Sequence, residues 1–190
     1  GKVIVWADDI TRYYGTITAR GGQAGGDGGF AEVSGKRLLD FNGAVDLGAA
    51  HGTGGTLLLD PLNITLSTGV AANITGFTPP GDQTEAWNDD AGLNSVFNVS
   101  AGGSFAAVAA GTTIRLEATN DITVANTFNV GTATGQSNVS LDLRARNDIN
   151  VNAAITTTGT GTISLAADAS FAGTGGAASD GIGNVALNAA

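Results

Sequence analysis

One pattern recurs along this chain at intervals of roughly 22 to 28 residues, and it restricts the possible folds more than any other feature. Each repeat begins with a short run in which apolar and polar residues alternate, and it ends at glycine or at Asn and Asp. The first runs align at Val3, Ala31, Leu57, Ile114, Val139, Ile163 and Val185. Repeats of this length are typical of solenoids, because a short unit can bury its apolar face only against its neighbours.

The alternating runs predict strands. β-Branched residues are frequent in them, and alternation turns successive side chains to opposite faces of a sheet. In the fifth repeat, Val139 and Leu141 lie in the first run, and Ile149 and Val151 lie in the second. Runs this short do not form a free-standing sheet, so each must pair with its equivalent in the next repeat, at about 4.8 Å. We therefore predict an all-β fold, a parallel β-helix, as a single unit over residues 1–190.

Asn and Asp mark the predicted corners between runs. Asn-Asp-Ile occurs at 120–122 and again at 147–149, and Asp-Asp-Ile at 8–10 and Leu-Asn-Ile at 62–64 are variants of it. Asn and Asp tolerate left-handed backbone conformations and form hydrogen bonds with their own backbone, as a tight corner requires. Glycine runs close most repeats, where positive φ or close backbone approach is needed.

The glycine-rich stretch GGDGGFAEVSG at 25–35 could instead cradle phosphate or calcium. A phosphate-binding P-loop has four residues between its glycines and a hydroxyl residue after its lysine. Here five residues separate Gly29 from Gly35, and Arg37 follows Lys36. The calcium-binding nonapeptide G-G-x-G-x-D-x-U-x is not matched either, because Ala24 takes the place of its third glycine and Gly26 that of its aspartate. We interpret the stretch as a corner.

Residues 68–111 do not follow the repeat. They contain two of the three prolines and Trp87, which predicts a loop or a side excursion from the solenoid. At the end of the excursion, Ser104 is suited to cap a helix and Gly111 to end it, which predicts one or two helical turns between them. Insertions in solenoids often lie on the binding face, so the excursion is either a recognition element or a structural cap.

The composition argues against several classes of function. The formal net charge is −9, with 8 Lys and Arg against 17 Asp and Glu, which argues against nucleic acid as a partner. The absence of Cys excludes disulfides and thiolate metal sites. No apolar run reaches the length of about 20 residues that spans a bilayer. The chain begins in a strand pattern without Met or a signal peptide, which indicates a piece of a longer polypeptide.

Three segments carry a resemblance to a known family: GGDGGFAEVSG at 25–35, GTLLLDPLNIT at 55–65 and LEATNDITV at 116–124. They resemble the filamentous haemagglutinin-like large exoproteins, the passengers of bacterial two-partner secretion systems. The match is strong over 1–66 and 104–155, and it is to an internal part of the passenger. The resemblance implies a right-handed β-helix, secreted or exposed at the bacterial cell surface after export through an outer-membrane transporter barrel. It also implies an adhesin, a filament or a stalk.

A polysaccharide lyase on the same scaffold is the alternative. Lyases of this architecture resemble one another in having clustered carboxylates for calcium and a basic residue that abstracts a proton. The candidate residues here are Asp142, Arg144, Arg146 and Asp148, and alternation places the first three on one outward face. A solvated, charge-balanced strand face explains the pattern as well. We therefore expect no enzyme activity and assign no catalytic, cofactor-binding or metal-binding residue.

The remaining candidates have structural explanations as well as functional ones. His51 lacks a second His or a Cys for a zinc site or a triad, so we expect an exposed corner residue. A stacked surface of Trp6, Tyr13 and Tyr14 could bind sugar, but packing against a neighbouring turn also accounts for these side chains. We expect Trp6 to face outward, because it is out of phase with the valines before it.

Outward threonines and glycosylation sequons complete the candidates. Thr156, Thr157 and Thr158 suggest an ice- or crystal-binding face, although the threonine spacing is irregular from repeat to repeat. Some relatives in the resembled family are glycosylated at Asn-x-Ser/Thr. In this chain the sequons are Asn63, Asn73, Asn98 and Asn138.

We expect no cofactor. The expected partners are glycans or proteins of a host surface or matrix, the transporter barrel for the full-length protein, and a second copy of the chain. Both ends of a β-helix expose unpaired strand edges, which predicts head-to-tail association into filaments.

Overall fold

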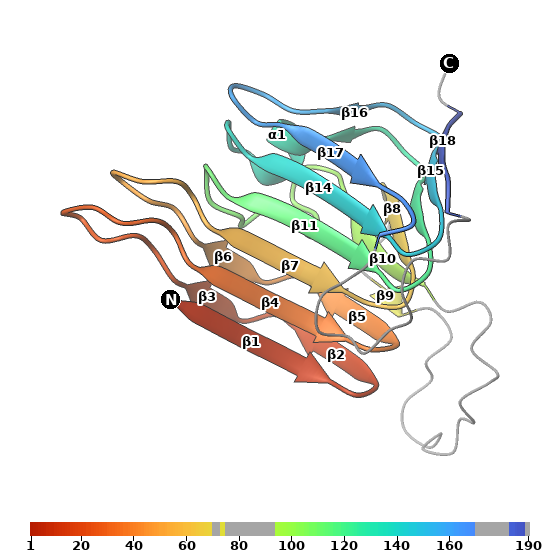
Figure 1. The fold of residues 1–190 in the computed structure, drawn as a ribbon, viewed down its shortest axis with the longest axis horizontal. Helices are drawn as coiled ribbons and strands as arrows, with labels where there is room; N and C mark the ends of the chain where they lie inside the picture. Colours follow the sequence, from red (N-terminus) through yellow and green to blue (C-terminus); the bar gives the residue numbers. More distant parts are fainter. Residues whose placement is uncertain (70–72, 75–93, 170–182, 189–190) are drawn as a thin grey trace.

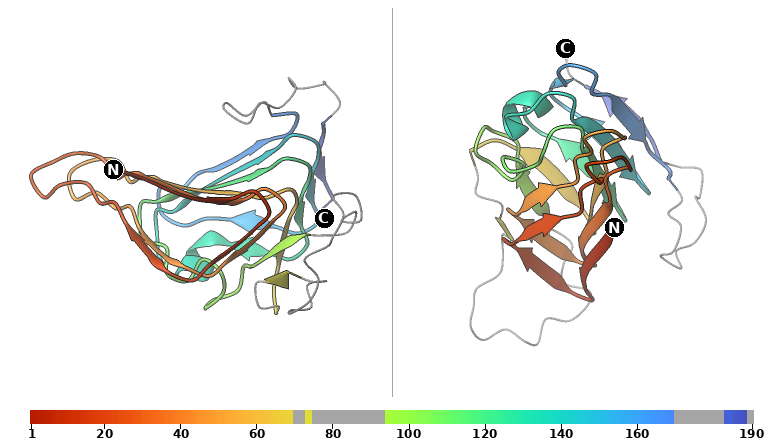
Figure 2. Two further views of the ribbon diagram at one scale, coloured as in Figure 1. Left: turned by 90° about the horizontal axis from the view of Figure 1, so that it is seen from below. Right: turned by 90° about the vertical axis from the view of Figure 1, so that its left-hand side faces the viewer.

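The computed structural model describes residues 1–69, 73–74, 94–169 and 183–188 of the chain. These residues wind into a β-solenoid of about five turns, which confirms the predicted all-β fold and its stacked parallel strands. Successive turns lie one above the other from the N-terminal turn to the C-terminal one (Figure 1). Viewed from below, the N-terminal turns lie over one another, and the later turns are progressively displaced from them (Figure 2).

One side of the solenoid is a six-stranded parallel sheet, which we call sheet 1. Its order is β1 (Lys2–Ala7), β4 (Phe30–Gly35), β7 (Thr56–Asp60), β11 (Thr113–Ala118), β14 (Ser140–Ala145) and β17 (Ile163–Ala166). The predicted repeat starts are largely confirmed, with two corrections. The residue that aligns with Ile114 is Leu141, two positions after Val139. Val185 does not belong to this sheet, because its strand pairs with a different side of the turn below.

The second side, sheet 2, has the order β18 (Val185–Leu187), β15 (Ile149–Val151), β12 (Ile122–Val124), β8 (Ile64–Ser67), β10 (Ser95–Asn98) and β9 (Asn73–Ile74). All neighbours in it are parallel except β10 and β9. Three parallel pairs complete the turns: β2 (Ile10–Tyr13) with β5 (Leu38–Phe41), β3 (Thr16–Thr18) with β6 (Ala44–Asp46), and β13 (Phe128–Asn129) with β16 (Ile155–Thr156).

Inward side chains form one continuous apolar core. In sheet 1 the row at Ala31, Leu57, Ile114 and Leu141 is fully buried, and each residue lies on its equivalent one turn away. Phenylalanines from β10, from β13 and from the turn between β10 and β11 also lie in the core. The ring of Phe105 lies 5.8 Å from that of Phe97 and 5.6 Å from that of Phe128, measured between centroids.

The predicted helical turns at 104–111 are wrong, because the chain forms non-helical turns there. The hydroxyl of Ser104 accepts a hydrogen bond from the backbone N–H of Asn98 instead of capping a helix. Val108 then pairs in parallel with Val45 of β6. Burial of Phe105 and Val108 in the core therefore overrides the helix propensity of the alanines around them. Trp87 and the prolines of the excursion lie outside the described residues.

Within the described ranges, only α1 (Val130–Thr134) is an α-helix, and the sequence pattern did not predict it. The side chain of Asn129 accepts from the backbone N–H of Thr132, and Gly135 ends the helix in the left-handed conformation. A single turn with a good cap at each end is too short to produce a helical period in the sequence.

The Asn and Asp residues lie at corners, as predicted, and their side chains form a ladder from turn to turn. The expected left-handed backbone is not found at them, because among the described non-glycine residues only Asn138 and Asp168 have positive φ. Oδ1 of Asn63 accepts from the backbone N–H of Asp121 at 3.3 Å, and Oδ1 of Asp121 accepts from that of Asp148 at 3.0 Å. Oδ1 of Asp148 then accepts from the backbone N–H of Asn184 at 2.8 Å. Asp9 departs from the ladder, because its carboxylate pairs with Arg37.

The predicted corner at 25–35 is only partly confirmed, because Phe30–Gly35 form β4 and only residues 25–29 lie outside the strand. Residues 25–29 belong to a protruding connection, residues 19–29. This connection lies against the equivalent connection of the next turn, residues 47–55 (Figure 1). A Cβ on Gly28 would lie 1.8 Å from the carbonyl oxygen of Leu47, so only glycine permits this approach of the two backbones.

Candidate functional site

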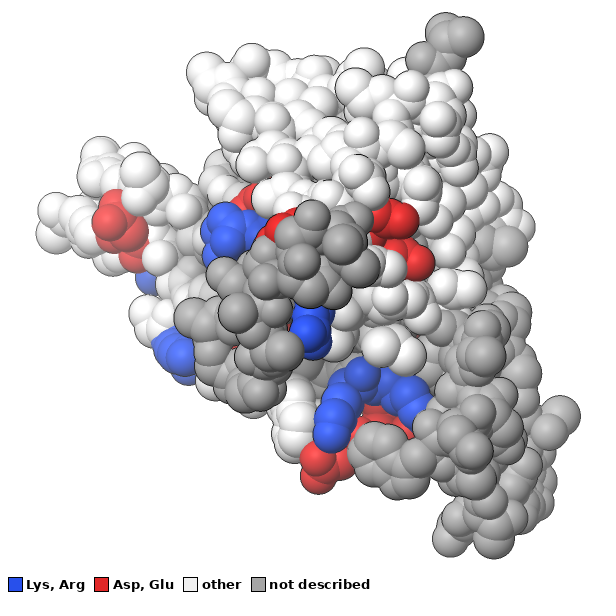
Figure 3. Space-filling model, turned by 45° about the vertical axis from the view of Figure 1, so that its right-hand side comes forward, with Lys and Arg blue, Asp and Glu red and all other residues white. Residues whose placement is uncertain are grey.

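The charged residues of sheet 1 gather on its outward face. Side chains alternate along each strand, so Glu32, Asp60, Glu117, Asp142 and Arg144 point away from the core while the residues between them point inward. Acidic and basic side chains lie next to one another on this side of the molecule, and the surface of the C-terminal turns above them carries few charges (Figure 3).

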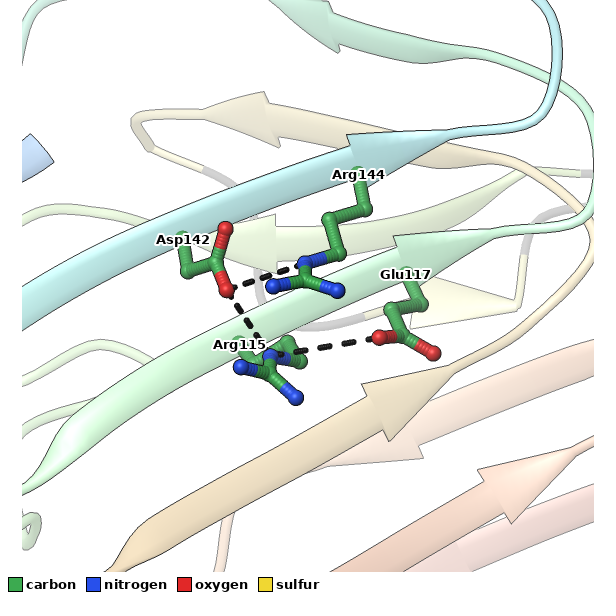
Figure 4. A network of polar contacts seen from close by, with 4 residues as sticks. All are labelled: Arg115, Glu117, Asp142 and Arg144. Atoms are coloured by element: carbon green, nitrogen blue, oxygen red, sulfur yellow. Dashed lines mark hydrogen bonds and ion pairs between the residues drawn. The ribbon is translucent and has the colours of Figure 1, made fainter. Parts of the chain in front are cut away.

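Asp142 is the centre of an ion-pair network between β11 and β14. Its Oδ2 accepts from Nε of Arg115 at 2.8 Å and from Nε of Arg144 at 3.0 Å (Figure 4). Oε1 of Glu117 lies 3.9 Å from Nε of Arg115. The register places Arg115 opposite Asp142 and Glu117 opposite Arg144, so opposite charges face each other across the two strands.

Asp142 is largely buried, with 10% of its side chain exposed. Its second oxygen, Oδ1, is buried and has no hydrogen-bond partner among the described residues. A buried carboxylate oxygen without a partner costs stability, so the two arginines must offset part of that cost.

A carboxyl pair lies beside this network. The pairing of Leu59 with Leu116 places Asp60 next to Glu117 at the end of the two strands. Burial, and then the charges of Glu117 and Glu32, raise the pKa of Asp60 to about 7. Burial also raises the pKa of Glu117, although Arg115 and Arg144 oppose this change. The pair therefore holds a proton near neutral pH, which is a property of many functional sites.

The structure brings together only part of the predicted charged set. Asp142 and Arg144 share the outward face, as the alternation predicted. Arg146 lies beyond the end of β14, where its backbone N–H bonds the carbonyl oxygen of Ala118. Asp148 belongs to the corner ladder and is not part of the network. The described part of the chain contains no group of three or more His, Cys, Asp or Glu side chains that could hold a metal ion.

The sequence pattern missed Arg115, Glu117 and Asp60. These residues lie in repeats other than that of Asp142, so their contacts depend on the register between turns. Charge complementarity was the signal that could have found them. Aligning Ile114 with Leu141 pairs Arg115 with Asp142 and Glu117 with Arg144, whereas aligning it with Val139 would pair Glu117 with Asp142.

The aromatic candidates do not form one surface. Trp6 faces outward as predicted and is 54% exposed. The ring of Tyr13 stacks on that of Phe41 in the next turn, with centroids 6.0 Å apart, so packing accounts for it. Tyr14 is exposed and donates its hydroxyl proton to Asp40, a hydrogen bond that raises its pKa. His51 is an exposed residue of the connection at residues 47–55, as expected.

The threonine candidates do not continue as a ladder. Thr156 lies beside Asn129 in the pairing of β13 with β16. The hydroxyl of Thr157 donates to the carbonyl oxygen of Val139 at 2.8 Å, so it is occupied.

The sequon residues have different surroundings. Asn138 is exposed, and its Oδ1 accepts from the backbone N–H of Thr160. The side chains of Asn63 and Asn98 are partly buried, and both are hydrogen-bonded. The side chain of Asn73 lies outside the described residues.

Comparison with known proteins found no matching family model, no matching curated protein and no matching solved structure. In the part of the chain that the structure describes, no helix is long and apolar enough to span a membrane.

Proposed function

We propose that this chain is a structural and adhesive segment of a secreted or surface-exposed bacterial exoprotein, without enzyme activity. The observation that carries the proposal is the unbroken six-stranded ladder of sheet 1 over one continuous aliphatic core. Backbone hydrogen bonds along such a ladder make a stiff rod, because each turn is held by its neighbours. The motifs GGDGGFAEVSG and GTLLLDPLNIT support the exoprotein assignment through their family resemblance.

The rod would act by its geometry. It would hold an adhesive surface away from the cell, where that surface meets glycans or proteins of a host or a matrix. In the full-length protein, export would use an outer-membrane transporter barrel. A gene for such a barrel next to the gene for this protein is the expected finding, and an unrelated neighbourhood would count against this route.

Association of copies end to end is part of the proposal. Among the described strands, β1 pairs only with β4, and β17 pairs only with β14. Val3, Val5 and Tyr13 are partly buried at the first turn, as Ile155 and Leu165 are at the last. Apolar ends with parallel strand edges can continue one another's ladders.

Val5→Lys should prevent this association, because it places a charge on the inward side of the terminal turn. Ile4→Lys is the matched control, since Ile4 lies on the same strand but points outward. We expect wild type and Ile4→Lys to form elongated particles in negative-stain images at high concentration, and Val5→Lys to remain dispersed. Equal behaviour of the three proteins would contradict end-to-end stacking.

A carbohydrate-active enzyme, such as a polysaccharide lyase, is the second candidate. The observation that favours it is the carboxyl pair of Asp60 and Glu117 beside Arg115 and Arg144, because proton transfer needs a group that titrates near neutral pH. Incubation with uronic-acid polysaccharides and calcium separates the two candidates. Unsaturated products that absorb in the ultraviolet would establish the enzyme, and their absence is expected for the adhesive segment.

A further inference from the structure

We propose that the peptide bond between Asp60 and Pro61 is a self-processing site, which the folded chain cleaves by using its own carboxyl groups and water. Asp60 is the last residue of β7, and Pro61 begins the corner that follows it. This is the one Asp-Pro bond in the sequence. The inference goes beyond the proposed function, because it concerns how the chain is divided and not what its surface binds.

The first argument is the position of the carboxyl groups. The pairing of β7 with β11 places Glu117 beside Asp60, and the pairing of β4 with β7 places Ser34 on the other side of Asp60. One carboxyl group can therefore attack while its neighbour supplies a proton. Two carboxyl groups divide nucleophile and acid roles in this way when their surroundings separate their protonation.

The second argument is the nature of the bond. Proline nitrogen belongs to a tertiary amide and carries no hydrogen, so it donates no backbone hydrogen bond, and on protonation it leaves as a secondary amine. Pro61 is buried, and its carbonyl oxygen accepts from the backbone N–H of Thr119 at 3.2 Å. The fold therefore holds the proline next to the carboxyl pair, which replaces a chance encounter by a fixed arrangement.

The reaction consumes one water and needs no oxidant or metal. The protonated carboxyl group of Asp60 attacks the backbone carbonyl carbon of the same residue, its proton passes to the carboxylate of Glu117, and a five-membered cyclic anhydride forms. The bond from that carbon to the proline nitrogen breaks, and the nitrogen keeps the electron pair and takes the proton of Glu117. Water then opens the anhydride, which leaves carboxyl groups at the side chain and at the new C-terminus, and Glu117 is ionised as it was at the start.

The charged groups around the bond set its pH dependence. Glu32 of β4, Arg115 and Glu117 of β11, and Asp142 and Arg144 of β14 share its outward face, and Ser164 and Ala166 of β17 add no charge. Between about pH 4 and 7 the raised pKa of Asp60 keeps its carboxyl group at least partly protonated, whereas the carboxyl group of an ordinary aspartate in an unfolded chain has lost its proton. We expect cleavage to be fastest in this range.

Intact mass spectrometry of the purified chain, incubated at pH 6 and 37 °C, tests the proposal. We expect two fragments, residues 1–60 and residues 61–190, to appear at least about tenfold faster in the folded protein than in 8 M urea at the same pH. Equal rates in the two states, or no fragments in the folded state, would overturn the proposal, and this comparison needs no variant.

Two variants separate the chemistry from general lability. Pro61→Ala keeps both carboxyl groups and removes the tertiary amide. Glu117→Gln keeps the bond and removes the proton donor, so general acid catalysis predicts a loss of about a hundredfold. Asp27→Asn, on the protruding connection, is the control and should cleave as wild type does. Cleavage of the Pro61→Ala and Glu117→Gln proteins at the wild-type rate, with melting transitions intact, would also contradict the mechanism.

Discussion

Phe105→Ala should lower the free energy of unfolding by about 3 to 5 kcal/mol, as truncation of a fully buried phenylalanine does. Phe105 is fully buried between Phe97 and Phe128 and lies in a turn, where no ladder of strand hydrogen bonds compensates for a lost ring. The two neighbouring rings cannot close the cavity, because each is fixed on a paired strand. Urea unfolding followed by circular dichroism measures the loss.

Leu187→Ala is the control for this substitution. Leu187 is 71% exposed on β18, so its truncation should change the free energy of unfolding by less than about 0.5 kcal/mol. A loss below about 1 kcal/mol for Phe105→Ala would show that the turn at 101–107 does not hold the aromatic stack in the core.

Asp60→Asn should stabilise the protein above neutral pH. The pKa of Asp60 in the folded state, about 7, is higher than in the unfolded chain, so the folded state holds its proton more tightly. The stabilisation from this proton is complete below about pH 4 and is lost as the pH rises to about 7. The asparagine cannot ionise and avoids this loss. At pH 8 we expect a gain on the order of 3 kcal/mol.

Urea unfolding at pH 4, 6 and 8 measures this effect. Wild type should lose stability across the window, and Asp60→Asn should lose much less, with the remainder due to Glu117, whose pKa is also raised. Asp27 provides the opposite control. The backbone N–H of Thr53 lowers its pKa, so its contribution is present above pH 4 and is lost on acidification. Parallel pH profiles for wild type and Asp60→Asn would show that the pKa of Asp60 is not raised in the folded state.

Much of the fold could be predicted because the apolar residues that recur in each repeat are the residues that form the core. Alternation at Ile114 and Leu116, recurring at Leu141 and Leu143, states which side chains are buried and which strands are equivalent. The positions of the corners could be predicted for a similar reason, because Asn and Asp recur there in successive turns. The ladder could not be predicted, because each of its side chains bonds the backbone of a different turn.

The errors have one physical origin, since they concern contacts between repeats. An apolar residue two positions away satisfies the same alternation, so hydrophobicity alone did not distinguish Val139 from Leu141 as the partner of Ile114. The alanine-rich turns at 104–111 follow the core and not their helix propensity, because Phe105 must reach two rings from other turns.

The candidate site was harder to predict than the fold. Asp142 and Arg144 could be found because they lie on one strand. The carboxyl pair could not, because 56 positions separate Asp60 from Glu117 along the chain (117 − 60 − 1) and only the pairing of β7 with β11 unites them. The raised pKa of Asp60 depends on burial and on neighbouring charges, and neither is visible in the motif around it.

The central claim is that successive turns stack in parallel register, and a pair of spin-label distances tests it most directly. The chain has no cysteine, so labels can be placed on Lys2→Cys with Ser140→Cys, and on Trp6→Cys with Arg144→Cys. These pairs lie at the two ends of β1 and β14, which are four strand spacings apart in sheet 1. The parallel stack predicts about 19 Å between backbones for both pairs. Two clearly unequal distances, or distances beyond about 30 Å, would contradict it.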